Sequence, residues 1–264
     1  MKSASDSKTI IAQVKDLGVS IIPNFFPKTD CDRYVAILEQ ILSERVKNGT
    51  YFGSNKSQVI YNYFLHNPEL FALVHNQMID EVMKKLIDED FVLISPSARN
   101  PRIRHDLPEG HKTSGVGWHN DSRVYNKQDG SLYRPSMSFY AAVALEEFNM
   151  NNASTHFVPS SHLRYQKPLD RNAVLDHETF LAPVGSLIFF DSALWHKVGD
   201  STFNSRWSIF NMYGPWFMKP YFRFPENYGA EQVERLPAAI KKLLHFNSTP
   251  PRNEIEGLNT LVKL

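Results

Sequence analysis

The residues Ser136-Met-Ser-Phe-Tyr-Ala-Ala-Val-Ala-Leu145 have the pattern of a β-strand with two unlike faces. Successive side chains of a strand point to opposite sides. One face therefore carries Ser138, Tyr140 and Ala142, which are small or polar enough to line a cofactor pocket. The other face is apolar and indicates a core; it carries Met137, Phe139, Ala141, Val143 and Leu145. The stretch predicts a strand with a hydrophobic core on one side and a pocket on the other.

Four further runs have strand character, at residues 91–94, 155–158, 184–190 and 206–213. Pro96 interrupts the chain after the first of them, and loops rich in Asn, Ser, Pro and Gly separate the others. Short strands without long helices between them favour a sandwich or jelly roll over βαβ units. We predict a mainly β fold with flanking helices and a jelly-roll, cupin-like core.

Helical patterns precede and follow this β region. Residues 9–17 predict a short helix that Gly18 stops, and residues 19–22 predict a short strand. The other helices are one that Thr29 or Asp30 caps, one that starts at Asn67-Pro68 and reaches Leu86, and one at residues 231–244. We predict a single domain over residues 1–264. Its helical part, about 1–90, packs on a core at about 91–225, and a C-terminal helix and tail follow at about 226–264.

The composition excludes several classes of protein. The chain has 264 residues with 29 Lys and Arg against 28 Asp and Glu, so its net charge of +1 argues against nucleic-acid or membrane-surface partners. A single cysteine, Cys31, excludes an internal disulfide and thiolate-rich metal sites. The sequence has neither a transmembrane run nor the apolar segment of a signal peptide. We expect a soluble, cytoplasmic protein, and its oligomeric state is left open.

Two histidines and a carboxylate are placed as a metal site would need them. Trp118-His119-Asn120-Asp121 puts a histidine and an aspartate two positions apart, on the same face of an extended segment. His196 follows the strand that ends in Phe189-Phe190-Asp191. Two imidazoles and one carboxylate are the set that binds Fe(II) on one face and leaves three positions open. We predict that His119, Asp121 and His196 are catalytic metal ligands.

Ten positions after His196, Arg206-Trp207-Ser208 puts an arginine and a serine on one face of the next strand. The open positions on the metal could accept a bidentate 2-oxo acid and dioxygen. Arg206 could then hold the distal carboxylate of 2-oxoglutarate through a charge-assisted, two-pronged contact, and Ser208 could add a hydroxyl.

These motifs together resemble the phytanoyl-CoA dioxygenase family. The resemblance spans about residues 15–225 and includes Ala144-Leu-Glu-Glu-Phe148, Val158-Pro-Ser-Ser-His162 and Val184-Gly-Ser-Leu-Ile-Phe-Phe-Asp191. It implies a double-stranded β-helix that uses Fe(II), 2-oxoglutarate and O2. It also implies that His119, Asp121 and His196 hold the iron and that Arg206 anchors 2-oxoglutarate. His162 matches a structural histidine of the family, and a carboxylate at 121 favours oxidation without halide incorporation.

The substrate contacts are less defined by the sequence. Tyr140 and Ser138 are candidate contacts for 2-oxoglutarate, although Tyr140 could equally be a core tyrosine with a satisfied hydroxyl. Arg123 and Tyr125 follow Asp121 closely and are candidates for contact with the substrate. The basic stretch 97–117, which includes Arg104, is either a solvated loop or a lid that suits an acidic substrate. Trp118 and Trp195 each flank a ligand histidine and are expected to support it by packing.

The sequence thus predicts a dioxygenase that hydroxylates a C–H bond of a small molecule, in specialised metabolism, and releases succinate and CO2. The alternatives are a cupin-like metal-binding isomerase or binding protein that is not an oxygenase, and a protein without catalysis. Arg206 argues against the first alternative, since such proteins need no cation there. The intact set of His119, Asp121, His196 and Arg206 argues against the second, since an unused site should tolerate the loss of at least one of them.

Overall fold

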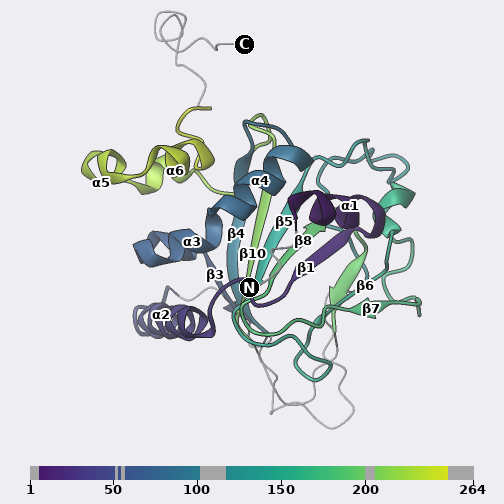
Figure 1. Ribbon diagram of the computed structural model, residues 1–264, viewed down its shortest axis with the longest axis horizontal. Coiled ribbons are helices and arrows are strands. Elements are labelled where there is room, and N and C mark those ends of the chain that lie inside the picture. Colours follow the sequence, from purple (N-terminus) through teal and green to yellow (C-terminus); the bar gives the residue numbers. More distant parts are fainter. Residues whose placement is uncertain (1–5, 51–52, 55–56, 102–116, 200–205, 249–264) are drawn as a thin grey trace, which may run out of the picture.

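The computed structural model describes residues 6–50, 53–54, 57–101, 117–199 and 206–248, and its core is two antiparallel sheets (Figure 1). The large sheet has the strand order β1-β8-β5-β10-β4-β3-β2, and the small sheet has the order β7-β6-β9. The strands are β1 (Val19–Ile22), β2 (Gly53–Ser54), β3 (Ser57–Tyr61), β4 (Val92–Asn100), β5 (Phe139–Ala144), β6 (Thr155–Phe157), β7 (Glu178–Thr179), β8 (Leu187–Asp191), β9 (His196–Val198) and β10 (Ser208–Gly214). The predicted mainly β fold with a jelly-roll core is confirmed.

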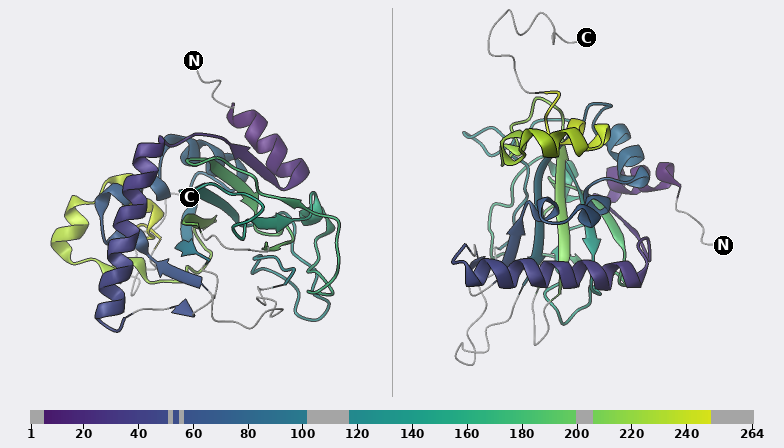
Figure 2. Two further views of the ribbon diagram at one scale, coloured as in Figure 1. Left: turned by 90° about the horizontal axis from the view of Figure 1, so that it is seen from below. Right: turned by 90° about the vertical axis from the view of Figure 1, so that its left-hand side faces the viewer.

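Helices cover the outer face of the large sheet, on the side away from the small sheet (Figure 2). The α-helices are α1 (Ser7–Leu17), α2 (Lys28–Lys47), α3 (Phe71–Val74), α4 (Gln77–Leu86), α5 (Ala230–Arg235) and α6 (Ala238–Leu243). The 3₁₀ turns are η1 (Tyr63–Leu65), η2 (Pro68–Leu70), η3 (Ser161–Arg164) and η4 (Phe224–Asn227). No helix in the described part of the chain is long and apolar enough to cross a membrane.

The two faces of β5 are buried in different clusters. The alternation predicts the first of them as core, and the face expected to line a pocket also packs in a hydrophobic cluster. Phe139, Ala141 and Val143 belong to the cluster under the helices. Tyr140 and Ala142 belong to the cluster between the two sheets, where β6 and β8 also contribute side chains. Met137 is an exception, because it lies before the strand begins and packs against the cluster between the sheets.

The prediction that Pro96 ends the first strand is wrong, since β4 continues to Asn100. Pro96 lies opposite Asn211 of β10, near a register shift between Met212 and Tyr213. On the other side, the pairing of β4 with β3 stops at Ser97, one residue from the proline. Proline has no N–H to donate, so a position where pairing stops on one side tolerates it. Strands β2 and β3 were not predicted.

Two of the predicted helices are interrupted. The helix expected to run from Pro68 to Leu86 divides into η2, α3 and α4, because His75 is extended (φ −149°) and the Asn76 side chain caps α4 by accepting from the Ile79 N–H. The C-terminal helix is divided at Leu236-Pro237 into α5 and α6. Helix α2 follows Pro27 and has no side-chain cap, so neither Thr29 nor Asp30 caps it.

Gly18 ends α1 as predicted, and β1 then enters the large sheet beside β8. Gly18 has φ +89°, and its N–H donates to the Val14 carbonyl. A Cβ at this position would lie 2.5 Å from Leu194 and 2.8 Å from His162. Both the backbone conformation and the space therefore favour glycine. The turn brings the N-terminal segment against the chain that leads to His196.

Candidate metal centre

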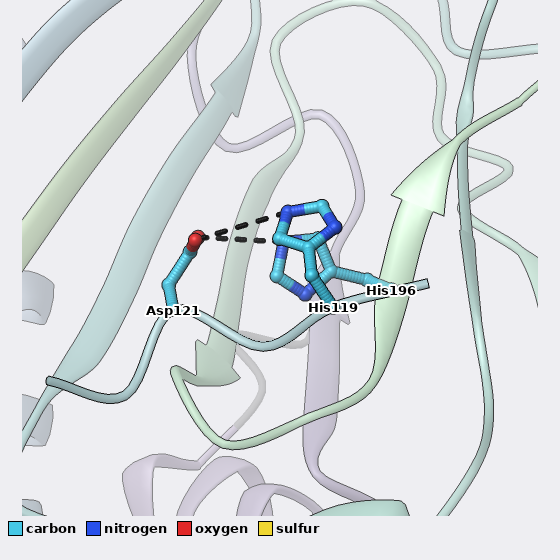
Figure 3. Close-up of side chains that lie close together, drawn as sticks. All are labelled: His119, Asp121 and His196. Carbon is cyan, nitrogen blue, oxygen red and sulfur yellow. Dashed lines mark ion pairs between the residues drawn. The ribbon is translucent and has the colours of Figure 1, made fainter. Parts of the chain in front are cut away.

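Backbone hydrogen bonds hold the two ligand segments together. The His119 N–H donates to the His196 carbonyl (3.0 Å), and the His196 N–H donates to the His119 carbonyl (2.8 Å). The Asp121 N–H donates to the Ser192 carbonyl in the turn after β8 (2.8 Å). The three predicted ligands, 119, 121 and 196, are thus brought to one place by main-chain pairing between segments far apart in the sequence (Figure 3).

The three side chains converge at a distance suited to a metal ion. Nε2 of His119 lies 3.8 Å from Oδ1 of Asp121, and Nε2 of His196 lies 3.3 Å from Oδ2 of Asp121. One ligand atom from each residue lies within 4.8 Å of the others. With bonds of about 2.1 Å, adjacent ligands of a six-coordinate ion are about 3 Å apart. The donor set and spacing therefore fit a divalent transition metal.

Both histidines present the same nitrogen to the site. Nδ1 of His119 is 2.8 Å from the Gly117 carbonyl, and Nδ1 of His196 is 2.8 Å from the Leu194 carbonyl. A carbonyl only accepts hydrogen bonds, so each Nδ1 carries the proton and donates. Each Nε2 faces Asp121, and in the neutral ring, with the proton on Nδ1, this nitrogen is the one that can bind a metal.

The electrostatics of the group favour an ionised Asp121 and a neutral His119, and they draw His196 and Asp121 together. Burial and the neighbouring His196 lower the pKa of His119 to about 4. Burial alone would raise the pKa of Asp121, but attraction to His196 and a hydrogen bond with it outweigh burial and hold that pKa below its usual range. For His196 burial lowers the pKa, yet the attraction of Asp121 is stronger and the net direction is upward. Asp121 is therefore ionised between the two histidines, and its negative charge would stabilise a bound cation.

Tyr140 contacts the carboxylate ligand directly. Its hydroxyl donates to Oδ2 of Asp121 (2.9 Å), and its ring stacks on Phe190 with centroids 4.6 Å apart. The structure thus places Tyr140 in the cluster between the two sheets and gives its hydroxyl a partner. Ser138, the residue before this strand, is buried and shares a 2.6 Å hydrogen bond with the hydroxyl of Ser192.

Arg206 is buried without a carboxylate partner among the described residues. Its Nη1 donates to the Ser208 hydroxyl (3.0 Å), its Nη2 donates to the Ala153 carbonyl (2.9 Å), and its Nε has no partner in this part of the structure. The guanidinium lies 3.7 Å from the centroid of the Phe148 ring. Burial lowers the pKa of Arg206 to about 9. A buried cation with an unpaired N–H is a binding group for a small carboxylate.

The remaining predicted residues have other neighbours. Arg123 lies over the Tyr221 ring, and Tyr125 lies under the Lys167 ammonium. Arg104 falls outside the described residues, as does most of the predicted lid. His162 is not part of the metal group; its Nε2 bonds to the Lys15 carbonyl (2.9 Å) beside Gly18.

The tryptophans next to the ligand histidines hold the surrounding loops. The Trp118 indole donates to the Ala173 carbonyl (2.9 Å), and the Trp195 indole donates to the Gln166 carbonyl (2.8 Å). Both rings pack in one small cluster with Val158. Their packing beside the ligand histidines agrees with a supporting role.

Two further residues, Arg99 and Tyr221, lie near the metal group. Arg99 is in the stretch 97–117 that was predicted as a loop or lid, but residues 97–100 belong to strand β4, and Tyr221 was not proposed from the sequence. Arg99 lies in β4 with its guanidinium carbon 5.7 Å from the Phe210 ring centroid, and its charge acts on His196 and Tyr140. In β4, buried Ala98 is followed by exposed Arg99, as in a strand with one buried face. This alternation could have marked Arg99, but Pro96 was taken to end the strand. Tyr221 lies beyond the last strand, where no periodic pattern marks it.

Two facing antiparallel sheets with a His-x-Asp pair and a distant histidine define a jelly-roll protein with a two-histidine, one-carboxylate metal site. The chain belongs to the phytanoyl-CoA dioxygenase family, whose sequence profile matches residues 14–206. This agrees with the resemblance found in the motifs.

Relatives of known sequence or structure cover most of the chain. The uncharacterized proteins Rv1501 of Mycobacterium tuberculosis and Mb1539 of Mycobacterium bovis are each 26% identical over 266 aligned residues, which is 92% of this chain and 89% of theirs. The epimerase SnoN, crystallised with Fe3+, alpha-ketoglutarate and a nogalamycin, superposes with a TM-score of 0.61 at 15% identity, over 88% of this chain and 90% of its own. HygX from Streptomyces hygroscopicus, crystallised with nickel and 2-oxoglutarate, gives 0.62 at 14% identity, over 84% and 93%. The two structures have the same fold as this chain.

Proposed function

We propose that the protein is an Fe(II)- and 2-oxoglutarate-dependent dioxygenase that hydroxylates a C–H bond of a small molecule, in specialised metabolism in the cytoplasm. The observation that carries the proposal is the group formed by His119, Asp121 and His196, in which both Nε2 atoms face one carboxylate. Membership of the family supports the same reaction class.

His119, Asp121 and His196 would hold the iron, and Arg206 with Ser208 would hold the distal carboxylate of 2-oxoglutarate. Iron and 2-oxoglutarate together supply the oxidising chemistry, in which O2 converts 2-oxoglutarate to succinate and CO2 and one oxygen atom goes to the substrate. The protein's part is to fix the ligands and to exclude water. The unpaired Nε of Arg206 supports the carboxylate assignment, because a buried cation gains most from an anionic partner.

Tyr140 would act by holding Oδ2 of Asp121, so that the other carboxylate oxygen faces the metal. Contact of Tyr140 or Ser138 with 2-oxoglutarate stays a prediction, since both hydroxyls already have protein partners. Whether the oxidised carbon of the substrate is hydroxylated or epimerised is a question for product analysis. SnoN is described as an epimerase, and HygX has also been crystallised with hygromycin B, so members of this fold handle different small molecules.

The test is an anaerobic titration of the metal-free protein with Fe(II) and then 2-oxoglutarate. We expect a visible charge-transfer band and a higher melting temperature, and neither in His196→Ala. Absence of the band together with an unchanged melting temperature would reject the proposal. If the band forms, succinate release over a metabolite library, with product analysis for hydroxylation and epimerisation, identifies the substrate.

A further inference from the structure

Four cations in the loops around the metal centre lie on aromatic rings. We call Arg123, Arg134, Arg164 and Lys167 the rim cations. Arg123 lies 3.3 Å from the ring centroid of Tyr221, Arg134 lies 3.9 Å from that of Tyr165, Arg164 lies 4.6 Å from that of Trp195, and Lys167 lies 3.3 Å from that of Tyr125. None of the four has a carboxylate within ion-pair distance in the described part of the chain.

The loops that carry the rim cations are tied to the metal ligands. The side chain of Asn120, between two ligands, donates to the Gln166 carbonyl, and the Trp195 indole donates to the same carbonyl. The Leu132 N–H donates to the Tyr165 carbonyl, so the loop after Asp121 lies against the segment after η3. The rim cations therefore border the metal centre.

Several cations farther from the metal centre are instead paired with carboxylates. Arg33 bonds Glu69 (2.7 Å), Lys84 bonds Asp80 (2.8 Å) and Lys242 bonds Asp90 (2.8 Å). Near the rim, Asp121 is a metal ligand, and Asp129 accepts from Ser131 instead of an arginine. A chain with a net charge of +1 thus leaves uncompensated positive charge beside its metal centre.

Arg123 is the rim cation closest in sequence to the reaction centre, two positions after Asp121. Its guanidinium makes no hydrogen bond to any described residue and is solvent-exposed. The Tyr221 ring beneath it is anchored through its backbone N–H, which donates to the Ile94 carbonyl (3.0 Å). Tyr221 also contributes to the raised pKa of Tyr140, after burial and Asp121, which agrees with its position near the carboxylate ligand. A guanidinium stacked by its face keeps its in-plane N–H groups for a second partner.

We propose that Arg123, held on Tyr221, binds a carboxylate of the substrate, so that the substrate is an organic acid. The inference rests on the proposed function, because the bound acid is a substrate only if the protein is an oxygenase. Binding of the acid at Arg123 does not itself require iron. Arg123 and Tyr221 are then the specificity-determining residues. A neutral or cationic substrate would gain no electrostatic attraction from the rim cations.

The experiment uses ligand-observed NMR on the metal-free full chain, with fragment-sized aromatic carboxylates that are each matched with the primary amide. We expect the acids to bind about tenfold more tightly than their amides, as a charge-assisted hydrogen bond predicts. The preference should disappear in Arg123→Gln and weaken in Tyr221→Leu. Arg33→Gln is the matched control, because Arg33 also lies over a tyrosine ring, Tyr34, but on α2; it should keep the full preference.

Two results would overturn the inference. One is a wild-type protein that binds acids no better than amides, including no binding of either. The other is a preference that persists in Arg123→Gln, which would assign the acids to a different cation, such as Arg206 or another rim cation. Neither result bears on iron or 2-oxoglutarate, whose binding the anaerobic titration tests separately.

Discussion

The hydroxyl of Tyr140 donates a 2.9 Å hydrogen bond to Oδ2 of Asp121, the carboxylate that also faces both ligand histidines. One strand of the large sheet thus fixes the orientation of a side chain in a loop outside it. Because Tyr140 is buried and stacked on Phe190, its position does not depend on the metal.

Removal of this hydroxyl in Tyr140→Phe is expected to weaken Fe(II) affinity about tenfold while the fold persists. The carboxylate would lose a hydrogen bond that orients it, and such supporting contacts are typically worth 10–100-fold in affinity. Calorimetric titration with the metal measures the change. Tyr125→Phe, which removes a hydroxyl from a ring under Lys167, is the control. Equal affinities for the two variants would contradict the role given to Tyr140.

Two buried histidines should respond differently to replacement by alanine. His196→Ala removes a ligand and should abolish metal binding. His162→Ala removes the 2.9 Å bond to the Lys15 carbonyl, so it should lower the free energy of unfolding by about 1–3 kcal/mol and leave metal binding in place. Metal titration and urea unfolding of both variants provide the comparison. Loss of the metal site in a folded His162→Ala protein would count against this division.

Arg206→Lys should reduce 2-oxoglutarate affinity by about tenfold or more with little change in Fe(II) affinity. Lysine keeps the charge but loses the planar pair of donors, and the Ser208 and Ala153 contacts cannot both be kept. The dissociation constant of 2-oxoglutarate, measured through the charge-transfer band, reports the effect. An unchanged constant would place the distal carboxylate elsewhere, with Arg99 the next candidate.

The thiol of Cys31 should be inert in the folded protein. Burial, and then the charges of Asp30 and Asp32, raise its pKa from 9.0 to about 11. At pH 8 the thiolate fraction is then about 100-fold lower than in the unfolded chain, and alkylation by iodoacetamide should slow at least in proportion. Since the folded pKa is the higher one, its contribution to stability is complete below pH 9 and is lost as the pH rises from 9 to about 11. Fast alkylation without urea would contradict this.

Gly18→Ala should destabilise the protein more than Gly49→Ala. Both residues have positive φ, +89° and +67°, so each substitution carries a backbone cost of about 1 kcal/mol. A Cβ at Gly18 would also collide with Leu194 and His162, whereas nothing lies within 4 Å of one at Gly49. The difference in unfolding midpoints in urea isolates the collision. Similar midpoints would mean that the α1–β1 turn can shift freely.

The sequence predicted best where its pattern was periodic or its chemistry local. The alternation in β5 separated its two faces correctly, and the spacing of His119, Asp121 and His196 marked residues that the fold brings together. The full extent of β4 was not predicted. A proline ends a strand only where the neighbouring strand needs an N–H from that position, and the sequence of β4 alone does not show how its neighbours pair. Likewise, the interruption before Asn76 rests on a single side-chain cap within an otherwise helical pattern.

The contacts of Tyr140 with Asp121 and of Tyr221 with Arg123 had no signal in the sequence. The partner of Tyr140 is a loop residue 19 positions away, and Tyr221 reaches Arg123 only because the chain returns across the sheet after β10. Both contacts depend on how strands and loops pack against one another. The hydrophobic periodicity of a single strand or helix carries no information about that packing.

The reciprocal bonds between the main chains of His119 and His196 have a consequence for how the centre can be studied. Peptide groups make these bonds, so they remain when either imidazole is replaced or the ion is withdrawn by a chelator. The empty scaffold should therefore keep its shape, and ions of different size and redox behaviour can be exchanged into one unchanged frame. With a redox-inert ion in the site, binding of the substrate could be measured without turnover, whereas with Fe(II) the substrate would be converted to product.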